Sequence, residues 1–131
     1  MKSFNKLSIL TGWLMFAIAA PVYMLSAEPT ASLWDCGEFI SAAYKLEVVH
    51  PPGAPLFLMI GRLFAFVGES VGADMSSIAY AINVMSGLCT AFLVLFVCWS
   101  TIILSKLAMV GRYEAPEAGG QTIAILGSGV V

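Results

Sequence analysis

The chain has 131 residues, of which 60% are hydrophobic and 11% are charged, and its formal net charge at pH 7 is −2. Soluble domains carry roughly 25% charged residues, so this composition is typical of a membrane protein. The basic residues form no patch or run, which excludes nucleic acid as a partner.

The first apolar segment, residues 7–27, holds no formal charge. About 20 apolar residues are needed to cross a bilayer as a helix, so we predict a first transmembrane helix here. A cleaved signal peptide is the alternative, because Lys2 and Lys6 precede the segment and small residues end it. The apolar region of a signal peptide is usually only about 7–15 residues long, which favours a retained helix.

The polar residues that follow have a helical spacing over residues 33–47. At 100° per residue, one side of this helix collects the following residues: Asp35, Glu38, Ser41, Ala42 and Lys45. We therefore predict an interfacial helix with its polar face toward water. Asp35 and Glu38 also have the spacing of a capping box, in which the two side chains accept backbone N–H groups at the start of a helix. Spacing alone leaves both interpretations open.

The sequence His-Pro-Pro-Gly ends this helix. A proline favours an extended conformation in the residue before it, so His50 must leave the helix. Pro51, Pro52, Gly53 and Pro55 are predicted to form a stiff turn, with Pro55 in the first turn of the next helix. The single histidine can be a structural hydrogen-bonding residue or a ligand, and both interpretations stay open.

The apolar segment 55–67 is too short to cross the membrane and has Arg62 in its middle. We expect a buried, re-entrant or interfacial helix. A guanidinium in such a helix is costly, so it marks a functional site or a buried partner, unless the side chain extends to the membrane surface. Its planar fork matches phosphate oxygens, which makes an anion clamp the functional interpretation. Asp74 is either the N-cap of the next helix or the partner of Arg62.

The second long apolar segment has no charged residue before Lys106. We predict a transmembrane helix over residues 75–107, longer than the ~30 Å hydrocarbon core requires. Residues 108–121 are predicted to be a polar loop. Residues 122–131 are apolar again but are only about half as long as a span, so we expect the start of a third transmembrane helix.

Charge placement predicts the orientation of these elements. Lys2 and Lys6 precede the first span, and Lys106 and Arg112 lie at the end of the second, whereas the loop 28–74 between the spans carries mostly acids. By the positive-inside rule, the N-terminus and residues 108–121 are cytoplasmic and the loop 28–74 is external, which is periplasmic for a bacterial inner membrane. The sequence thus predicts an all-α, multi-pass membrane fragment, the N-terminal part of one larger domain, that is inactive alone.

The segment WDCGEFISAAYKLEVVHPPGAPLF resembles the first external loop of a bacterial family of large multi-span membrane proteins of unknown function. That family belongs to the glycosyltransferase-C superfamily. Its eukaryotic relative is an endoplasmic-reticulum protein O-mannosyltransferase that acts on plexin-type receptors. The shared pattern is Asp, any residue, Gly, Glu and two apolar residues, followed later by His-Pro-Pro-Gly, any residue, Pro-Leu. Every position of the pattern is present.

The resemblance implies an inverting membrane glycosyltransferase that moves a sugar from a polyprenyl-phosphate carrier to a protein or glycan acceptor at the outer membrane face. The acceptor hydroxyl must lose its proton, which calls for a general base. The resemblance assigns that role to Asp35, with Glu38 orienting it or the acceptor, and carrier-phosphate binding to His50 and Arg62. It names the lipid-linked sugar as donor and no separate cofactor.

Metal dependence stays open. Two carboxylates and a histidine could bind a divalent ion, but they lack a tight ligand spacing, so no metal ligand is predicted. Two other functions also fit the composition: a transporter or flippase subunit that binds lipid-linked cargo without chemistry, and a small structural membrane protein in which Asp35 and Glu38 are only a cap.

Overall fold

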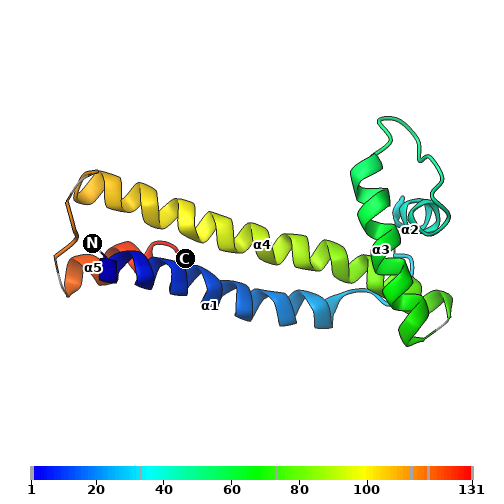
Figure 1. Cartoon of the computed structure of the whole chain (residues 1–131), viewed down its shortest axis with the longest axis horizontal. Coiled ribbons are helices and arrows are strands. Elements are labelled where there is room, and N and C mark those ends of the chain that lie inside the picture. The colour runs from blue at the N-terminus through cyan, green and yellow to red at the C-terminus, as the bar shows by residue number, and fades with distance from the viewer. Residues whose placement is uncertain (1, 33, 73, 113, 118, 131) are drawn as a thin grey trace. The chain divides into compact units, whose positions relative to one another are not determined.

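The computed structural model describes residues 2–32, 34–72, 74–112, 114–117 and 119–130. Within these ranges the chain forms helices and no strand (Figure 1). The helices are α1 (Lys2–Ser26), α2 (Cys36–Lys45), α3 (Pro55–Val71), α4 (Met75–Met109) and α5 (Gly120–Gly127). Two of them are long and apolar enough to cross a membrane, Phe4–Ser26 in α1 and the whole of α4. The predicted all-α membrane fold is confirmed.

The chain divides into two compact units, and α1 and α4 contribute to both. The span unit consists of Met1–Val22 and Cys89–Val131, and the loop unit is Tyr23–Leu88. The predicted transmembrane segments 7–27 and 75–107 lie within α1 and α4, apart from Ala27, which follows α1. Their orientation in a membrane stays a prediction.

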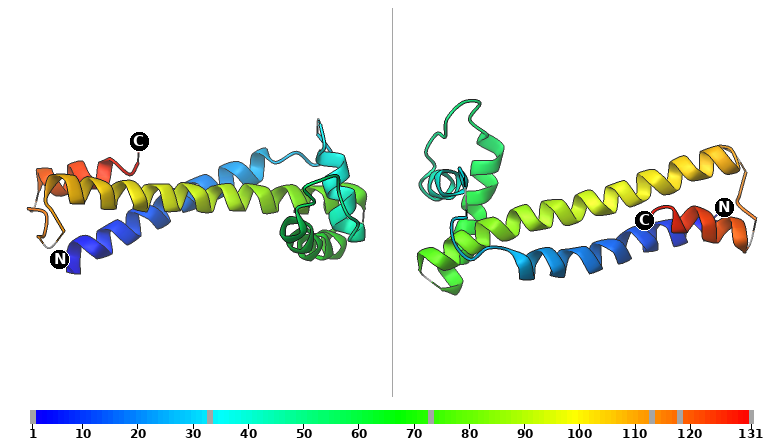
Figure 2. Two further views of the ribbon diagram at one scale, coloured as in Figure 1. Left: turned by 90° about the horizontal axis from the view of Figure 1, so that it is seen from above. Right: turned by 180° about the vertical axis from the view of Figure 1, so that it is seen from behind.

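In the span unit, α1 and α4 lie side by side and run in opposite directions (Figure 2). The Phe16 and Phe92 rings are 4.6 Å apart between centroids, and the Trp99 indole Nε1 donates to the Ser8 carbonyl oxygen at 3.1 Å. A Cβ added at Gly12 would lie 2.0 Å from that same Nε1. Glycine at this position therefore lets the indole rest on the α1 backbone.

The C-terminal helix α5 packs into the same unit. Ile125 is fully buried in a cluster with Phe4, Cys98 and Ile102. The Ser128 hydroxyl, just after α5, donates to the Ser105 hydroxyl oxygen at 2.8 Å. The apolar segment predicted to begin at residue 122 is thus helical from Gly120 to Gly127.

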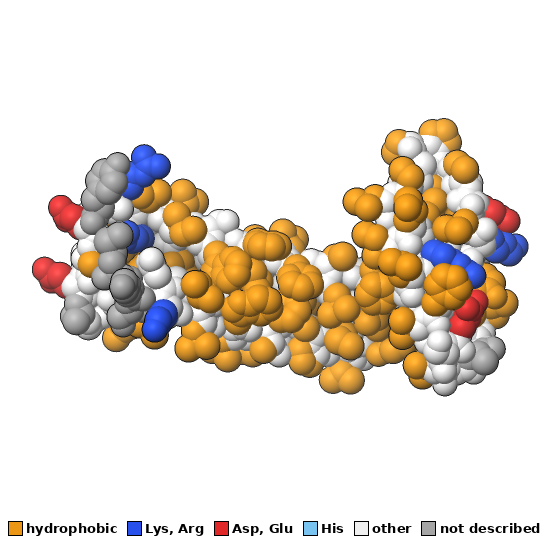
Figure 3. Space-filling model, in the orientation of Figure 1, with side chains coloured by type: hydrophobic (Ala, Val, Ile, Leu, Met, Phe, Trp, Pro, Cys, Tyr) orange, Lys and Arg blue, Asp and Glu red, His pale blue; other side chains and the backbone are white. Residues whose placement is uncertain are grey.

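The flanks of the two long helices carry apolar side chains. Hydrophobic side chains cover the visible faces of α1 and α4 in the span unit (Figure 3). Leu10, Leu14 and Ile18 on α1 are each more than half exposed. Such surfaces are suited to contact with lipid or with further helices, because exposed apolar area is unfavourable in water.

In the loop unit, α3 packs closely against α2 and the first turns of α4. Its buried face carries Leu58 and three small residues, Gly61, Ala65 and Gly68. A Cβ at Gly61 would come within 2.9 Å of the Ala43 Cβ, and one at Gly68 within 2.7 Å of the Ser77 carbonyl oxygen. Small residues on this face therefore allow backbone-to-backbone approach, as they do in membrane helix pairs.

The close packing of α2 corrects one part of its predicted polar face. Glu38, Ser41 and Lys45 are exposed as expected, but Ala42 is only 3% exposed. Ala42 and its neighbour Ala43 share the core cluster that α2 forms with α3 and α4. Placing Ala42 on the water-facing side was wrong, because a small side chain there lets α2 lie directly on its neighbours.

The segment between α1 and α2 is fastened to α4. The Asn83 amide Nδ2 donates to the carbonyl oxygens of Glu28 and Thr30, at 2.8 and 3.0 Å. The Ser76 hydroxyl donates to the Pro29 carbonyl oxygen at 3.1 Å. These bonds hold residues 28–30, which precede Asp35 in the chain, beside the first turns of α4.

Candidate active site

Asp35 is the N-cap residue of α2, yet it makes no side-chain capping hydrogen bond. The residue is half-buried, and it lines an open cavity of about 410 Å³. The capping-box alternative is therefore wrong for this helix: the Asp35 carboxylate is not used to satisfy the backbone of α2. A carboxylate that borders a cavity is available to a reacting group.

The cavity beside Asp35 is mainly apolar. Its other lining residues are Trp34, Cys36, Phe39, Ile40, Ala54, Phe57, Ile82, Asn83 and Ser86. Asn83 and Ser86 lie three residues apart on α4 and were not predicted as site residues. Two polar residues inside an apolar span were the signal available, since polar groups at membrane depth are often functional. The cavity thus joins a carboxylate, two polar side chains and an apolar wall.

Glu38 is bound by His50, twelve residues further along the chain. The His50 backbone N–H donates to Glu38 Oε1 at 2.9 Å, and the ring Nδ1 lies 2.8 Å from Oε2. The His50 ring also meets the edge of Phe39, with centroids 6.0 Å apart. Glu38 therefore fixes the His-Pro-Pro-Gly turn to α2, and the structure brings these two predicted site residues together.

This pairing shifts the ionisation of both groups. The two hydrogen bonds from His50, the backbone one first, lower the pKa of the Glu38 carboxyl below its ordinary value. The hydrogen bond to Glu38 and its negative charge raise the pKa of His50, and the charge of Asp35 adds to that effect. Both side chains are exposed. The pair consequently favours a carboxylate beside a protonated ring whose Nε2 is open to a second partner.

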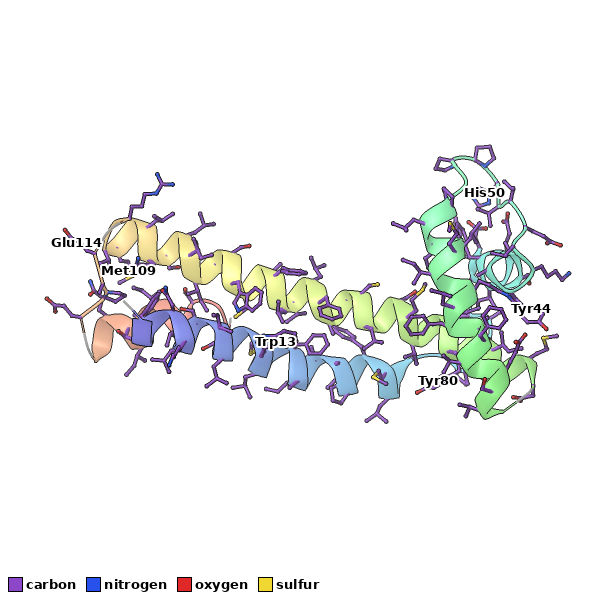
Figure 4. The ribbon with its side chains drawn as sticks, in the orientation of Figure 1. Trp13, Tyr44, His50, Tyr80, Met109 and Glu114 are labelled. Carbon is purple, nitrogen blue, oxygen red and sulfur yellow. The ribbon has the colours of Figure 1, made fainter. Side chains whose placement is uncertain are left out.

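The predicted turn residues lie between His50 and α3 (Figure 4). The peptide bond between Pro51 and Pro52 is cis, and Gly53 has a φ of 100°. The Gly53 N–H donates to the His50 carbonyl oxygen at 3.1 Å, and Pro55 occupies the first turn of α3. Glycine adopts positive φ without steric cost, so Gly53 allows the chain to turn back and bond to the His50 carbonyl oxygen. This turn fixes the backbone that carries the His50 ring.

Arg62 lies on α3 among different partners. Its guanidinium packs against the rings of Phe66 and Tyr44, at 4.2 and 5.0 Å from their centroids. Nη1 lies 3.5 Å from Glu69 Oε1, and this buried nitrogen has no hydrogen-bond partner among the described residues. Aromatic faces attract a cation, so they hold the guanidinium in place although its Nη1 makes no hydrogen bond.

Asp74 does not pair with Arg62. One of its carboxylate oxygens accepts from the Ser77 backbone N–H at 3.1 Å and also from the Ser77 hydroxyl. These bonds lower the pKa of Asp74. Of the two roles predicted for this residue, the structure shows the N-cap. In the part of the chain that the structure describes, no group of three His, Cys, Asp or Glu side chains could hold a metal ion.

Comparison with known proteins gives a consistent set of relatives. Residues 35–131 match the family model described as the protein O-mannosyl-transferase TMEM260 N-terminal domain. The sequence is 31% identical over 84 residues, 64% of this chain, to the protein O-mannosyl-transferase tmem260 of Dictyostelium discoideum. It is 36% identical over 74 residues, 56% of this chain, to the TMEM260 protein of Mus musculus. Each match covers 10% of the relative, and no solved structure matches.

Proposed function

Because this chain belongs to the family of the protein O-mannosyl-transferase TMEM260 N-terminal domain, we propose that it forms the first part of a membrane O-mannosyltransferase. The donor is a polyprenyl-phosphate sugar, with mannose as the sugar, and the acceptor is a hydroxyl group of a protein. The chain spans about a tenth of the length of the curated relatives that it matches. The complete enzyme therefore includes residues outside this chain.

The position of Asp35 is the observation that carries this proposal. The family match begins at this residue, and its carboxylate borders an open cavity instead of capping α2. In the proposed step, the acceptor oxygen attacks the anomeric carbon and Asp35 takes the hydroxyl proton. The bond between that carbon and the phosphate oxygen breaks, and its electron pair leaves with the phosphate. Such an in-line displacement inverts the anomeric carbon.

The leaving phosphate needs a positive partner rather than a general acid, because it is already a stable anion. A protonated His50 is suited to this role: Nδ1 is engaged by Glu38, and the half-exposed ring can offer Nε2–H. In this proposal Glu38 positions His50 and keeps it protonated, instead of orienting Asp35. Arg62 is a second anion-binding candidate; its buried Nη1 lies at ion-pair distance from Glu69, so phosphate binding there requires the guanidinium to turn away from that carboxylate.

The test is Asp35→Asn in the full-length protein. We expect transfer of the sugar to fall by about 10²–10⁴-fold, the usual contribution of a general base, while insertion and binding of the lipid-linked donor are kept. Transfer is measured with radiolabelled donor and a peptide acceptor, and donor binding by retention of the same label without acceptor. Unchanged transfer in Asp35→Asn would remove Asp35 as the base.

The matched variants separate chemistry from stability. Asp35→Glu keeps a carboxylate and is expected to retain part of the activity, whereas Asp35→Ala should resemble Asp35→Asn. Loss of donor binding in all three would instead favour a structural role for Asp35.

A further inference from the structure

The span unit contains an open cavity of about 690 Å³ that the glycosyltransferase proposal does not use. It lies between the first turns of α1 and the last turns of α4 and is lined by Phe4, Ile9, Trp99 and Ile103, among others. Two basic residues, Lys106 and Arg112, also line it. We propose that this cavity binds an anionic phospholipid, with the phosphate at Lys106 and Arg112 and an acyl chain along the apolar wall.

The charge of the lining matches an anion. Lys106 and Arg112 are the charged residues of the lining, and none of the lining residues is acidic. Lys106 is half-buried, and its Nζ lies 3.5 Å from the Arg112 carbonyl oxygen, which brings the two residues to the same end of the cavity. A phosphate between two cations gains charge-assisted hydrogen bonds from both.

The acids of this unit lie elsewhere among the described residues. Glu114 and Glu117 are exposed in the connection between α4 and α5, and neither lines the cavity. Glu117 is held there by its backbone, whose N–H donates to the Gln121 amide oxygen at 2.7 Å and whose carbonyl oxygen accepts from the Thr122 hydroxyl. The two cations of the cavity are therefore not neutralised by a neighbouring carboxylate of the lining.

The apolar wall matches an acyl chain. Ile9 and Ile103 are each more than half exposed, and Leu107 is 44% exposed. These side chains belong to the helix flanks that the composition places against the bilayer. Basic pockets between transmembrane helices are a known kind of binding site for anionic lipid head groups. A lipid satisfies the cations and the apolar wall with one molecule.

A further helix of the full-length protein is the rival occupant. An apolar helix packed here would bury Lys106 and Arg112 without an anion, which is costly at membrane depth. It would need to bring at least one carboxylate to this end of the cavity. A phospholipid does not need to supply a carboxylate, because each molecule carries a phosphate anion and an acyl chain together.

The experiment is native mass spectrometry of the full-length protein after delipidation and addition of phosphatidylglycerol or phosphatidylcholine. We expect phosphatidylglycerol to be retained several-fold more than phosphatidylcholine. The preference should disappear in Lys106→Gln/Arg112→Gln. Lys45→Gln, in the loop unit, is the matched control and should keep it.

A second variant tests the apolar part. Ile103→Trp fills the wall without changing the charge, so it should reduce retention of both lipids. Equal retention of the two lipids by the unaltered protein overturns the proposal, and so does a preference that survives in the double variant. Should the double variant fail to fold, Ile103→Trp decides: unchanged retention of phosphatidylglycerol overturns the assignment to this cavity. Sugar transfer is not part of this readout, so its outcome is separate from that of the proposed activity.

Discussion

Helices α2 and α4 of the loop unit both start next to an aspartate, and the two carboxylates have different surroundings. At α4, Asp74 accepts hydrogen bonds from the backbone N–H and the hydroxyl of Ser77. At α2, Asp35 makes no side-chain capping bond and borders a cavity. An aspartate at the start of a helix thus accepts a backbone hydrogen bond in α4, whereas in α2 its carboxylate makes no such bond and can contact a molecule in the cavity.

The residue three positions after each aspartate differs between the two helix starts. At α4 that residue is Ser77, whose backbone N–H and hydroxyl both donate to the Asp74 carboxylate. At α2 it is Glu38, which has no hydroxyl to donate to Asp35 and whose own carboxylate is bound by His50. The packing also differs, because a Cβ at Gly68 would lie 2.7 Å from the Ser77 carbonyl oxygen, whereas one at Gly37 would make an ordinary contact at 3.6 Å.

The largest expected difference between the two starts is in sugar transfer. Asp74→Asn keeps an N-capping side chain and lies outside the proposed site, so its transfer rate should stay close to that of the unaltered protein. Asp35→Asn should lose about 10²–10⁴-fold, as argued for a general base. The two variants are compared in one assay of the full-length protein, and equal losses would contradict the separation of roles.

The next effect is on packing. Gly68→Ala places a methyl group against the Ser77 carbonyl oxygen and the Ile78 Cα, at 2.7 and 2.8 Å. Backbone cannot give way as a flexible side chain can, so we expect a loss of about 1–3 kcal/mol in unfolding free energy. Gly37→Ala meets ordinary contact distances and should be neutral or stabilising by up to ~1 kcal/mol. Thermal unfolding of both variants in the same detergent checks this pair.

A smaller effect is expected from removing the caps themselves. Asp74→Ala loses the bonds to Ser77 and should lower the unfolding free energy by about 0.5–2 kcal/mol. Asp35→Ala removes no capping bond, so it should leave stability nearly unchanged. The midpoint of chemical unfolding compares them, and a larger loss for Asp35→Ala would mean that its carboxylate has a structural role.

The smallest effect is a change in titration at the Glu38–His50 pair. Folding favours the ionised carboxylate, so its contribution is lost as the pH falls through the lowered pKa of Glu38. Folding also favours the protonated ring, and that contribution is lost as the pH rises through the raised pKa of His50. The contact is therefore strongest between these two values, and transfer should decline above the upper one if protonated His50 holds the phosphate.

Histidine NMR of the full-length protein measures this once the His50 signal is assigned as the one that disappears in His50→Gln; His50 is the one histidine of this chain. We expect a pKa above the ordinary 6.5 in the unaltered protein and a lower one in Glu38→Gln, which keeps an oxygen acceptor but not the charge. A pKa that Glu38→Gln leaves unchanged would contradict the pairing. Lys45→Gln serves as the control for a general change in surface charge.

The sequence predicted the helices well because helix length and apolar spacing depend on local residues. The start of α3 at Pro55 and the two long helices follow from those patterns. Ala42 was misplaced because a helical pattern assigns a face by polarity, whereas a small residue can be buried for its size. The packing of α2 on α3 depends on pairs such as Ala43 and Gly61, which are far apart along the chain, and no local pattern contains them.

The candidate site was predicted by residue but not by arrangement. Asp35, Glu38 and His50 were selected, yet the bonds between Glu38 and His50 depend on the path of the proline turn. Asp74 was predicted to be either an N-cap or the partner of Arg62; the structure shows the cap, and the neighbours of Arg62 are Glu69, Tyr44 and Phe66. Asn83 and Ser86 join the cavity because α4 passes beside α2, which only the folded chain reveals.

Gly12 and Trp99 have a practical consequence for following how this protein assembles. The indole sits on the bare backbone of α1, with its N–H bonded to the Ser8 carbonyl oxygen. Indole emission depends on whether that N–H is bonded and on the polarity around the ring. The chain has three tryptophans, so replacing Trp13 and Trp34 by Phe leaves Trp99 as the one indole of this chain, and its emission then reports the moment at which the two long helices pair.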